Sequence, residues 1–134
     1  METRKTALVT GAAKGIGRQI AYCMAEAGYN VIVNYHSNKA AAEELCREME
    51  KFGVQTMTVY ADMGKVSDIE EMYRQVFEVF PVVDVLVNNA GISSEVYFLD
   101  ATEEMFDQMT AIDWKGVYFS SQIAAKKMIE QKVK

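Results

Sequence analysis

The stretch that decides the fold runs from Thr10 to Gly17 and reads TGAAKGIG. It lies between a short apolar run and a helical pattern, where a strand is expected to turn into a helix. Its glycines let the chain turn sharply and let a backbone or a ligand approach closely. The free N–H groups of a helix N-terminus then favour a phosphate. The loop predicts a dinucleotide-binding site, although three glycines are also compatible with a purely structural turn.

On both sides of this loop, apolar runs alternate with amphipathic stretches. We expect strands at Thr6–Thr10, Asn30–Tyr35, Gln55–Tyr60 and Val83–Val87, and helices at Gly15–Ala27, Lys39–Lys51, Ser67–Val79 and from Thr102 to the C-terminus. Glycine or proline follows the first three helices, and SDIE from Ser67 fits a capping box. This order predicts an α/β fold with a doubly wound parallel sheet of the Rossmann type, represented by its N-terminal part with four alternating strands. Residues 1–134 are expected to form a single domain.

Composition restricts the possible partners. The chain has 134 residues and a net charge of -5, so its surface disfavours nucleic acid and anionic membranes. Cys23 and Cys46 are isolated thiols, for which we expect neither a metal site nor a disulfide. No apolar run approaches the roughly 20 residues of a membrane span, and the N-terminus leads directly into a strand. We therefore expect no membrane association, and a cytoplasmic location.

A second motif, NNAG, occupies Asn88–Gly91 directly after the fourth expected strand. Gly91 permits a close backbone approach. Asn89 can tie the fourth strand to its neighbour. The alternative interpretation is a strand-exit turn without a ligand.

Together the two motifs resemble the short-chain dehydrogenase/reductase family. TGAAKGIG matches that family's T-G-x-x-x-G-x-G cofactor motif, NNAG matches its second signature, and Asp62 and Asp84 fall where the family usually has them. The resemblance covers Lys5 to about Gln131. The stretch VIVNYHSNKAAAEE is most similar to bacterial carrier-protein ketoreductases and related sugar dehydrogenases. The resemblance implies a nicotinamide-dependent oxidoreductase that reduces a carbonyl or oxidises an alcohol, on a small substrate that is free or bound to a carrier.

The resemblance also implies which residues contact the cofactor. They are Gly11, Ala13, Lys14, Gly15, Ile16, Gly17, Asn34, Tyr35, His36, Ser37, Asp62, Met63, Asn89, Ala90, Gly91 and Ile112. NADP(H) is favoured over NAD(H), because no carboxylate follows the second strand until Glu43 and because Lys14 lies inside the glycine loop. Lys14 and His36 are otherwise solvated loop residues, and Asp62 either binds the adenine or forms an Asx turn.

The family's catalytic residues are a serine on the fifth strand and a Tyr-x-x-x-Lys on the following helix, and the chain is expected to end before both. Tyr35 and Lys39 have the Tyr-x-x-x-Lys spacing, but they lie at the adenosine end, so we interpret the match as coincidence. Asp113 takes the place of a family asparagine and is a candidate catalytic residue, although an ionised carboxylate only accepts hydrogen bonds. Asp113 is otherwise a helix-bend residue. The alternative function is a non-catalytic fragment that binds nucleotide or pairs with a subunit.

A homo-oligomer is expected from two surfaces. With strands in the family order 3-2-1-4, the VDVLV strand lies at an edge on which Asp84 is the only charge. The last helix carries apolar side chains that lack a neighbouring helix in this part of the fold, namely Trp114, Tyr118, Ile123 and Met128.

Overall fold

A computed structural model describes residues 3–134. The expectation that the N-terminus leads directly into a strand falls partly outside the described residues, at Met1 and Glu2. The strands are β1 (Thr6–Val9), β2 (Asn30–Tyr35), β3 (Thr56–Tyr60) and β4 (Val85–Val87). The helices are α1 (Gly15–Glu26), α2 (Lys39–Met49), α3 (Val66–Val79), α4 (Glu103–Thr110) and α5 (Val117–Glu130). Short 3-10 turns occur at Glu50–Phe52 and Phe98–Asp100, and a π-helical segment at Ala111–Gly116 joins α4 to α5.

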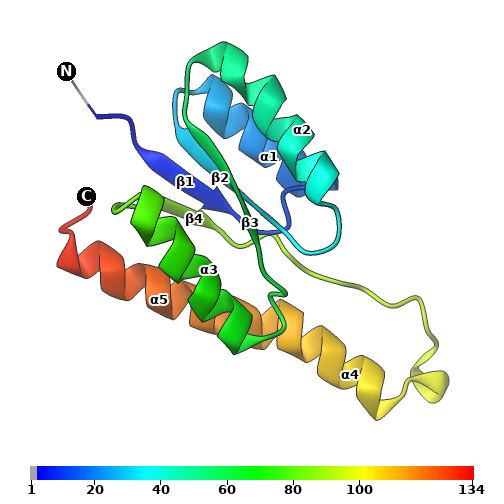
Figure 1. Ribbon diagram of the computed structural model, residues 1–134. Coiled ribbons are helices and arrows are strands. Elements are labelled where there is room, and N and C mark those ends of the chain that lie inside the picture. The colour runs from blue at the N-terminus through cyan, green and yellow to red at the C-terminus, as the bar shows by residue number, and fades with distance from the viewer. Residues whose placement is uncertain (1–2) are drawn as a thin grey trace.

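The strands form one parallel sheet in the order β3-β2-β1-β4, which confirms the expected fold class and strand order. Helices α1 and α2 cover one face of the sheet, and α3 and α5 cover the other (Figure 1). Successive residues of a strand point to opposite faces. Leu8 and Ile32 therefore join the α3 side, whereas Val9, Val31 and Val33 join the α1–α2 side.

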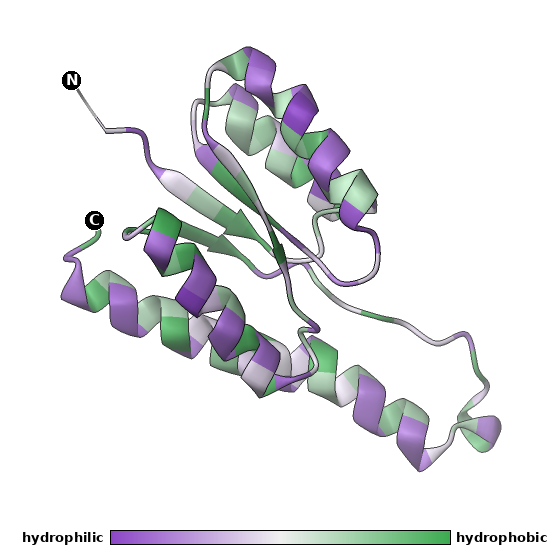
Figure 2. Cartoon of the chain, viewed as in Figure 1, coloured by the Kyte–Doolittle hydropathy of each residue, from purple (hydrophilic) through white to green (hydrophobic). Residues whose placement is uncertain are grey.

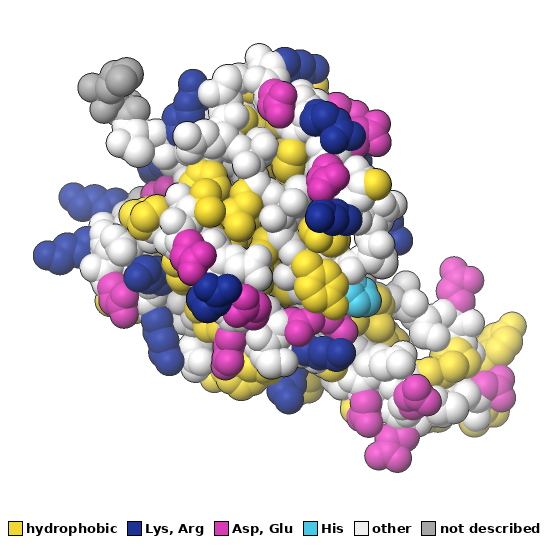
Figure 3. Space-filling view, in the orientation of Figure 1, with side chains coloured by type: hydrophobic (Ala, Val, Ile, Leu, Met, Phe, Trp, Pro, Cys, Tyr) yellow, Lys and Arg dark blue, Asp and Glu magenta, His cyan; other side chains and the backbone are white. Residues whose placement is uncertain are grey.

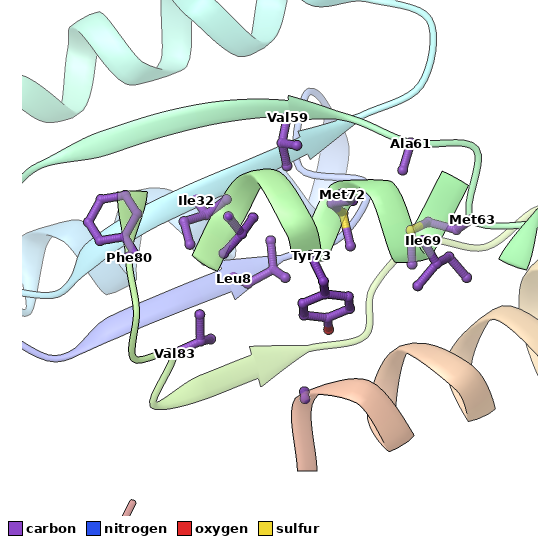
Figure 4. Packing of buried hydrophobic residues seen from close by; sticks show 12 residues of the cluster. Leu8, Ile32, Val59, Ala61, Met63, Ile69, Met72, Tyr73, Phe80 and Val83 are labelled. Atoms are coloured by element: carbon purple, nitrogen blue, oxygen red, sulfur yellow. The ribbon is translucent and has the colours of Figure 1, made fainter. Parts of the chain in front are cut away.

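The two central strands, β1 and β2, are almost entirely buried and mostly apolar, whereas the helices are apolar on one side only (Figure 2). On the α3 side, Ile69, Met72 and Tyr73 pack onto the sheet (Figure 4). Val76 belongs to the same cluster. Ala124 of α5 completes this layer. The core holds the carboxyl ends of β1 and β2 in fixed positions, and the glycine loop starts at this edge.

The prediction that Ser67 caps α3 is wrong. The helix begins at Val66, with Lys65 at the N-cap position and no side-chain capping bond. The turn before the helix is closed by Asp68 instead, whose carboxylate accepts the Asp62 N–H at 3.0 Å. Asp68 therefore bonds the chain just before the helix, and the capping box with Ser67 is not formed.

The fourth strand is shorter than predicted, and Asp84 precedes it. The carboxylate of Asp84 accepts the Thr6 N–H at 2.8 Å, and the Asp84 N–H donates to the Thr6 carbonyl at 2.9 Å. Asp84 is therefore committed to β1 and does not place a charge on the open edge of β4. This corrects the expectation that Asp84 supplies that charge.

From β4 the chain runs outward through Asn88–Thr102 before α4 begins, so that α4 projects away from the sheet (Figure 1). Thr102 caps α4, because its hydroxyl accepts the Met105 N–H at 3.2 Å. Trp114 and Tyr118 are exposed on the continuous helix that follows. Ile123 and Met128 instead pack against the core, so the prediction that they belong to the exposed apolar surface is wrong. They turn inward because α5 lies against α3.

Candidate functional site

The glycine loop is held by the end of the neighbouring strand. The Gly11 N–H donates to Asn34 Oδ1 at 2.9 Å, and the Ala12 N–H donates to the Asn34 carbonyl at 2.9 Å. The Asn34 amide group donates to the Val59 and Ala61 carbonyls at 3.4 and 3.5 Å. Asn34 is fully buried and its polar atoms have protein partners, so it positions the loop rather than presenting a side chain to a ligand.

Gly15 and Gly17 serve different purposes. A Cβ on Gly17 would overlap Asn89 Nδ2 and the Gly11 carbonyl, so α1 can approach β4 only with glycine here. Gly15 has φ +61°, and a Cβ there would meet nothing within 4 Å. Its surroundings are open, and the left-handed conformation favours glycine at this position.

The N-terminus of α1 has the features that a phosphate group requires. Lys14 occupies the N-cap position and makes no side-chain capping bond, which leaves the first N–H groups of the helix free of that partner. Lys14, Gly15 and Ile16 are exposed beside it, and Ala13 is half-buried. The open space and the uncapped helix end fit a dinucleotide pyrophosphate.

Thr10 connects the two sequence motifs, and the sequence analysis missed it as a site residue. Its buried hydroxyl accepts the Asn89 N–H at 3.0 Å and the Ala90 N–H at 2.9 Å. Asn89 in turn donates to the Thr10 and Gly11 carbonyls at 3.0 and 3.1 Å, the expected tie between β4 and β1. The signal that could have revealed Thr10 is a hydroxyl residue directly before the first glycine at a strand end.

Aromatic and acidic side chains gather where β2 and β3 end. Tyr35 and Tyr60 meet edge to face, with ring centroids 6.0 Å apart. His36 lies beside Tyr60, and Ser37 is exposed next to it. Asp62 forms the Asx turn that the sequence left open, because its Oδ1 accepts the Gly64 N–H at 2.9 Å. Met63 is buried in the core and offers mainly its backbone.

Tyr35 and Lys39 lie in this same region, away from NNAG. Lys39 begins α2, and its ammonium lies 3.7 Å from the Glu43 carboxylate, while the ring of Tyr35 contacts Tyr60. Neither residue approaches the loop after β4, where the chemistry of a nicotinamide would take place. Their spacing is therefore not a catalytic pair in this arrangement.

Asp113 lies in the π-helical segment and contacts the chain directly after NNAG. Its carboxylate accepts the Ile92 N–H at 2.8 Å, and it lies close to Gly91. Gly116 ends the segment, where any Cβ would overlap the Met63 carbonyl. π-Helical turns are rare and often mark functional sites. Ile112, half-buried, packs against Gly64 in the same region.

A buried polar contact fixes α5 beneath the site. The Tyr73 hydroxyl lies 2.9 Å from Ser120 Oγ and donates to the Ser120 carbonyl at 3.2 Å. Burial raises the pKa of Tyr73 to about 12, although the hydrogen bond with Ser120 opposes this shift. The phenol thus stays neutral and ties α3 to α5.

Two further properties concern metals and membranes. Within residues 3–134, no group of three or more His, Cys, Asp or Glu side chains is arranged to hold a metal ion. Cys23 and Cys46 are free thiols, and burial raises the pKa of Cys46. None of the helices in the described range has the length and apolar character to cross a membrane.

Comparisons of the sequence with known proteins all identify the same family. A family model described as short chain dehydrogenase matches residues 5–133. A 3-oxoacyl-(acyl-carrier-protein) reductase, FabG, from Staphylococcus epidermidis is 41% identical over 128 residues, which are 96% of this chain and 52% of that protein. The corresponding FabG from Staphylococcus aureus is 39% identical over 132 residues, 98% of this chain and 54% of that protein.

Two solved structures resemble the chain closely. A short chain dehydrogenase from Burkholderia cenocepacia, in complex with NADP, has a TM-score of 0.87 and 32% identity, covering 91% of this chain and 50% of that one. An acetoin dehydrogenase from Enterobacter cloacae has a TM-score of 0.91 and 33% identity, covering 98% of this chain and 52% of that one. The chain spans about half the length of the relatives that it matches.

Proposed function

This chain belongs to the short-chain dehydrogenase family, and from that premise we propose that it forms the cofactor-binding half of an NADP(H)-dependent oxidoreductase. The observation that carries the proposal is the uncapped N-terminus of α1 beside the open space at Gly15. Bound NADPH supplies the hydride for reducing a carbonyl, and NADP⁺ accepts it when an alcohol is oxidised. The residues of this chain bind and orient the dinucleotide.

The contacts proposed for the cofactor follow the edge of the sheet. The glycine loop and the N-terminus of α1 hold the pyrophosphate, and the ends of β2 and β3 hold the adenosine. Asn89, Ala90 and Gly91 border the nicotinamide side, together with Ile112. Asn34 and Thr10 position this set through hydrogen bonds rather than through contact with the cofactor.

A preference for NADP(H) over NAD(H) is supported by charge. The first residues after β2 are His36, Ser37, Asn38 and Lys39, and none of them carries a carboxylate that would repel a 2′-phosphate. Lys14 is exposed at the start of α1 and offers a cation to the same ligand. A similar structure is described as a complex with NADP.

The proposed substrate is a small carbonyl or alcohol compound, free or bound to a carrier, in keeping with the names of the relatives. We place the proton donor for its oxygen outside these 134 residues, because Tyr35 and Lys39 lie at the adenosine end. Asp113 is proposed to position the loop after NNAG, since its carboxylate holds the Ile92 N–H. The alternative is a chain that binds nucleotide or pairs with a subunit without catalysis.

We further propose that the chain is cytoplasmic and self-associates through α4 and α5. Trp114 and Tyr118 are 73% and 60% exposed on this helix, beside a groove lined by both. Acidic side chains lie before Trp114, at Glu103, Glu104 and Asp107, and basic ones lie after it, at Lys115, Lys126 and Lys127. Two copies packed antiparallel would bring opposite charges together at each end.

Titration of NADPH and NADH against the 134-residue chain and its Lys14→Ala variant tests the cofactor assignment. We expect tighter binding of NADPH, and a loss of that advantage by about tenfold in the variant, because one charge-assisted contact to phosphate is removed. Gly17→Ala, which distorts the loop, should weaken both cofactors alike. Equal affinity for the two cofactors in the wild type, unchanged by Lys14→Ala, would contradict the proposal.

A further inference from the structure

A carboxylate without an ionic partner stands beside the loop that follows β4. Asp113 Oδ1 accepts the Ile92 N–H at 2.8 Å, and the same oxygen would lie 3.2 Å from a Cβ placed on Gly91. Within residues 3–134, Asp113 forms no ion pair with a Lys, Arg or His side chain. The side chain is exposed, and carboxylates in contact with water are ionised at neutral pH. Asp113 therefore brings one uncompensated negative charge to the end of NNAG.

The chain around this carboxylate supplies no positive charge that would offset it. From Ile92 to Trp114 the sequence has no Lys, Arg or His, and acidic side chains gather on the projecting part of the molecule (Figure 3). Lys115 follows directly, but it lines the groove beside Trp114 and Tyr118, to which no NNAG residue contributes. The side of the site that Asp113 borders is thus negative.

The two redox forms of a nicotinamide cofactor differ by one charge, and that charge lies on the nicotinamide ring. The oxidised ring is a cation and the reduced ring is neutral, whereas the phosphate groups are the same in both forms. A negative charge attracts a cation over several ångströms, more strongly where water is excluded. A carboxylate beside the ring therefore distinguishes the two forms. The asparagine that the resembling family has at this position would hold the Ile92 N–H without this charge.

We propose that Asp113 is a specificity-determining residue for the redox state of the cofactor, because its carboxylate favours the oxidised, cationic nicotinamide over the reduced one. The proposal rests on the proposed cofactor site, in which Asn89, Ala90 and Gly91 border the nicotinamide. The hydrogen bond with Ile92 holds the charge in a fixed place beside this loop. Since the oxidised form is held more tightly, the bound cofactor is a stronger reductant than it would be beside an asparagine, which favours reduction of a carbonyl.

The test compares the affinities of NADP⁺ and NADPH for the 134-residue chain and for its Asp113→Asn variant, by calorimetric titration. Asparagine keeps an oxygen acceptor for the Ile92 N–H and removes the charge. In the variant, the ratio of the two affinities should shift toward NADPH by roughly threefold to tenfold. NAD⁺ and NADH should show the same shift, because the ring charge does not depend on the 2′-phosphate. A ratio that is the same in the wild type and the variant would overturn the proposal.

Glu103→Gln is the matched control. It removes a negative charge from the first turn of α4, on the same projecting part of the chain but away from NNAG. The ratio should stay as in the wild type, because the effect depends on a carboxylate next to the loop and not on the total charge. A shift as large as that of Asp113→Asn would mean that the general field of the acidic segment is responsible, and the role given to Asp113 would be wrong.

Salt separates an effect of charge from a change in the shape of the loop. Between about 0.01 M and about 0.15 M salt, the screening length falls from roughly 30 Å to roughly 8 Å. The difference in ratio between the wild type and Asp113→Asn should shrink accordingly, while screening of the phosphates affects both redox forms alike. A difference that does not respond to salt would show that the variant acts through the shape of the loop, and the proposal would fail.

Failure of this inference is distinguishable from failure of the proposed function. If both redox forms bind but their ratio does not respond to Asp113→Asn, the inference fails and the proposed cofactor site stands. If neither NADP⁺ nor NADPH binds to the wild type, both fail.

Discussion

Two connections leave the same edge of the sheet, and they differ in how the chain completes them. The first, between β1 and α1, is short, and Thr10 and Ala12 within it are almost fully buried. The second, between β4 and α4, begins with the bonds of Asn89 and Ile92 and then runs into solvent. Its 3-10 turn carries Phe98 and Leu99, which are 91% and 90% exposed.

The difference shows which of the two connections is held in its conformation by contacts within this chain. The first connection obtains its shape from atoms of this chain: the buried Asn34, the Thr10 hydroxyl and the close packing at Gly17. The second exposes apolar side chains among acidic ones, visible on the projecting part of the molecule (Figure 3). Residues 92–114 contain no Lys, Arg or His, and their acidic residues are Glu95, Asp100, Glu103, Glu104, Asp107 and Asp113. A surface with such exposed apolar side chains is typical of an interaction site rather than of an ordinary solvent-exposed surface.

The largest effect is expected where the first connection is packed most tightly. Gly17→Ala places a methyl group against Asn89 Nδ2 and the Gly11 carbonyl, so α1 must move away from β4. The free energy of unfolding should fall by about 3 kcal/mol, as for an overpacked core site, and cofactor binding should weaken strongly. Urea unfolding and a titration with NADPH measure both. In the matched variant Gly28→Ala the methyl group meets nothing within 4 Å. The φ of +93° strains the backbone there, but cofactor binding should stay intact because no atom of the loop is displaced.

The next effect concerns the hydroxyl that joins the two motifs. Thr10→Val keeps the shape of the side chain but leaves the N–H groups of Asn89 and Ala90 without their acceptor. The expected loss is about 2 kcal/mol of unfolding free energy, the cost of unsatisfied buried donors. Thr10→Ser keeps the hydroxyl and should cost about 1 kcal/mol or less, through the lost methyl group. Equal losses in the two variants would show that the hydroxyl bonds contribute little.

These two positions also show how far the sequence can be interpreted. The turns at the glycines follow from local chemistry. The strand order was expected from the family resemblance, and the tie through Asn89 from its place in the NNAG motif directly after the fourth strand. Gly17 is informative because it lies in a recognisable motif. The role of Thr10 was not predicted, since its hydroxyl bonds the chain 79 residues away, at Asn89, a distance along the sequence that no local pattern encodes.

The second connection and the helical segments that follow it were harder to predict, because their shape also depends on contacts between residues far apart in the sequence. The π-helical segment Ala111–Gly116 forms where Gly116 packs onto the Met63 carbonyl and Asp113 reaches the Ile92 N–H, which are both tertiary contacts. A helical periodicity does not distinguish such a segment from an α-helix. The capping-box prediction at Ser67 failed because α3 already begins at Val66, and the Asp68 carboxylate accepts the Asp62 N–H.

A third prediction concerns the contact that fixes α5 to α3. Tyr73→Phe removes the hydroxyl that contacts Ser120, and should lower the unfolding free energy by about 1 kcal/mol at neutral pH. The pKa of Tyr73 is raised from its ordinary value of 10.0 to about 12, so the neutral phenol is favoured in the folded state. This contribution is complete below the unfolded pKa, and it is lost as pH rises from about 10 to about 12.

The wild type should therefore lose its advantage over Tyr73→Phe in alkaline solution, by about 1.4 kcal/mol for each pH unit between about 10 and about 12. Denaturation of both proteins at neutral and at alkaline pH measures the change. A difference between them that stays constant with pH would mean that the phenol is not protected by burial.

A smaller effect is expected at Asp113, which holds the start of the second connection directly after NNAG. Asp113→Ala removes the acceptor of the Ile92 N–H, and because Asp113 is exposed we expect a loss of only about 0.5 kcal/mol. Hydrogen exchange at Ile92 should nevertheless become faster. Asp113→Asn keeps an oxygen in the same place and should preserve the protection of this amide. Unchanged exchange in the alanine variant would show that the loop after NNAG is held by other contacts.

The smallest effect on stability is expected at the 3-10 turn of the second connection. A triple variant with serine at Tyr97, Phe98 and Leu99 alters side chains that are at least 84% exposed, so the unfolding free energy should change by less than about 0.5 kcal/mol. Binding of NADPH should not change either, because the first connection holds the cofactor with its own atoms. Self-association is expected to weaken if this apolar turn adds to the proposed interface of α4 and α5. Light scattering over a range of concentrations, with Val79→Ser as a control on the exposed side of α3, measures that change. A large loss of stability in the triple variant would contradict the comparison, because it would mean that the turn packs against the body of the chain. Unchanged association would instead confine the interface to the helix that carries Trp114 and Tyr118, and the exposed turn would then have to serve a different contact.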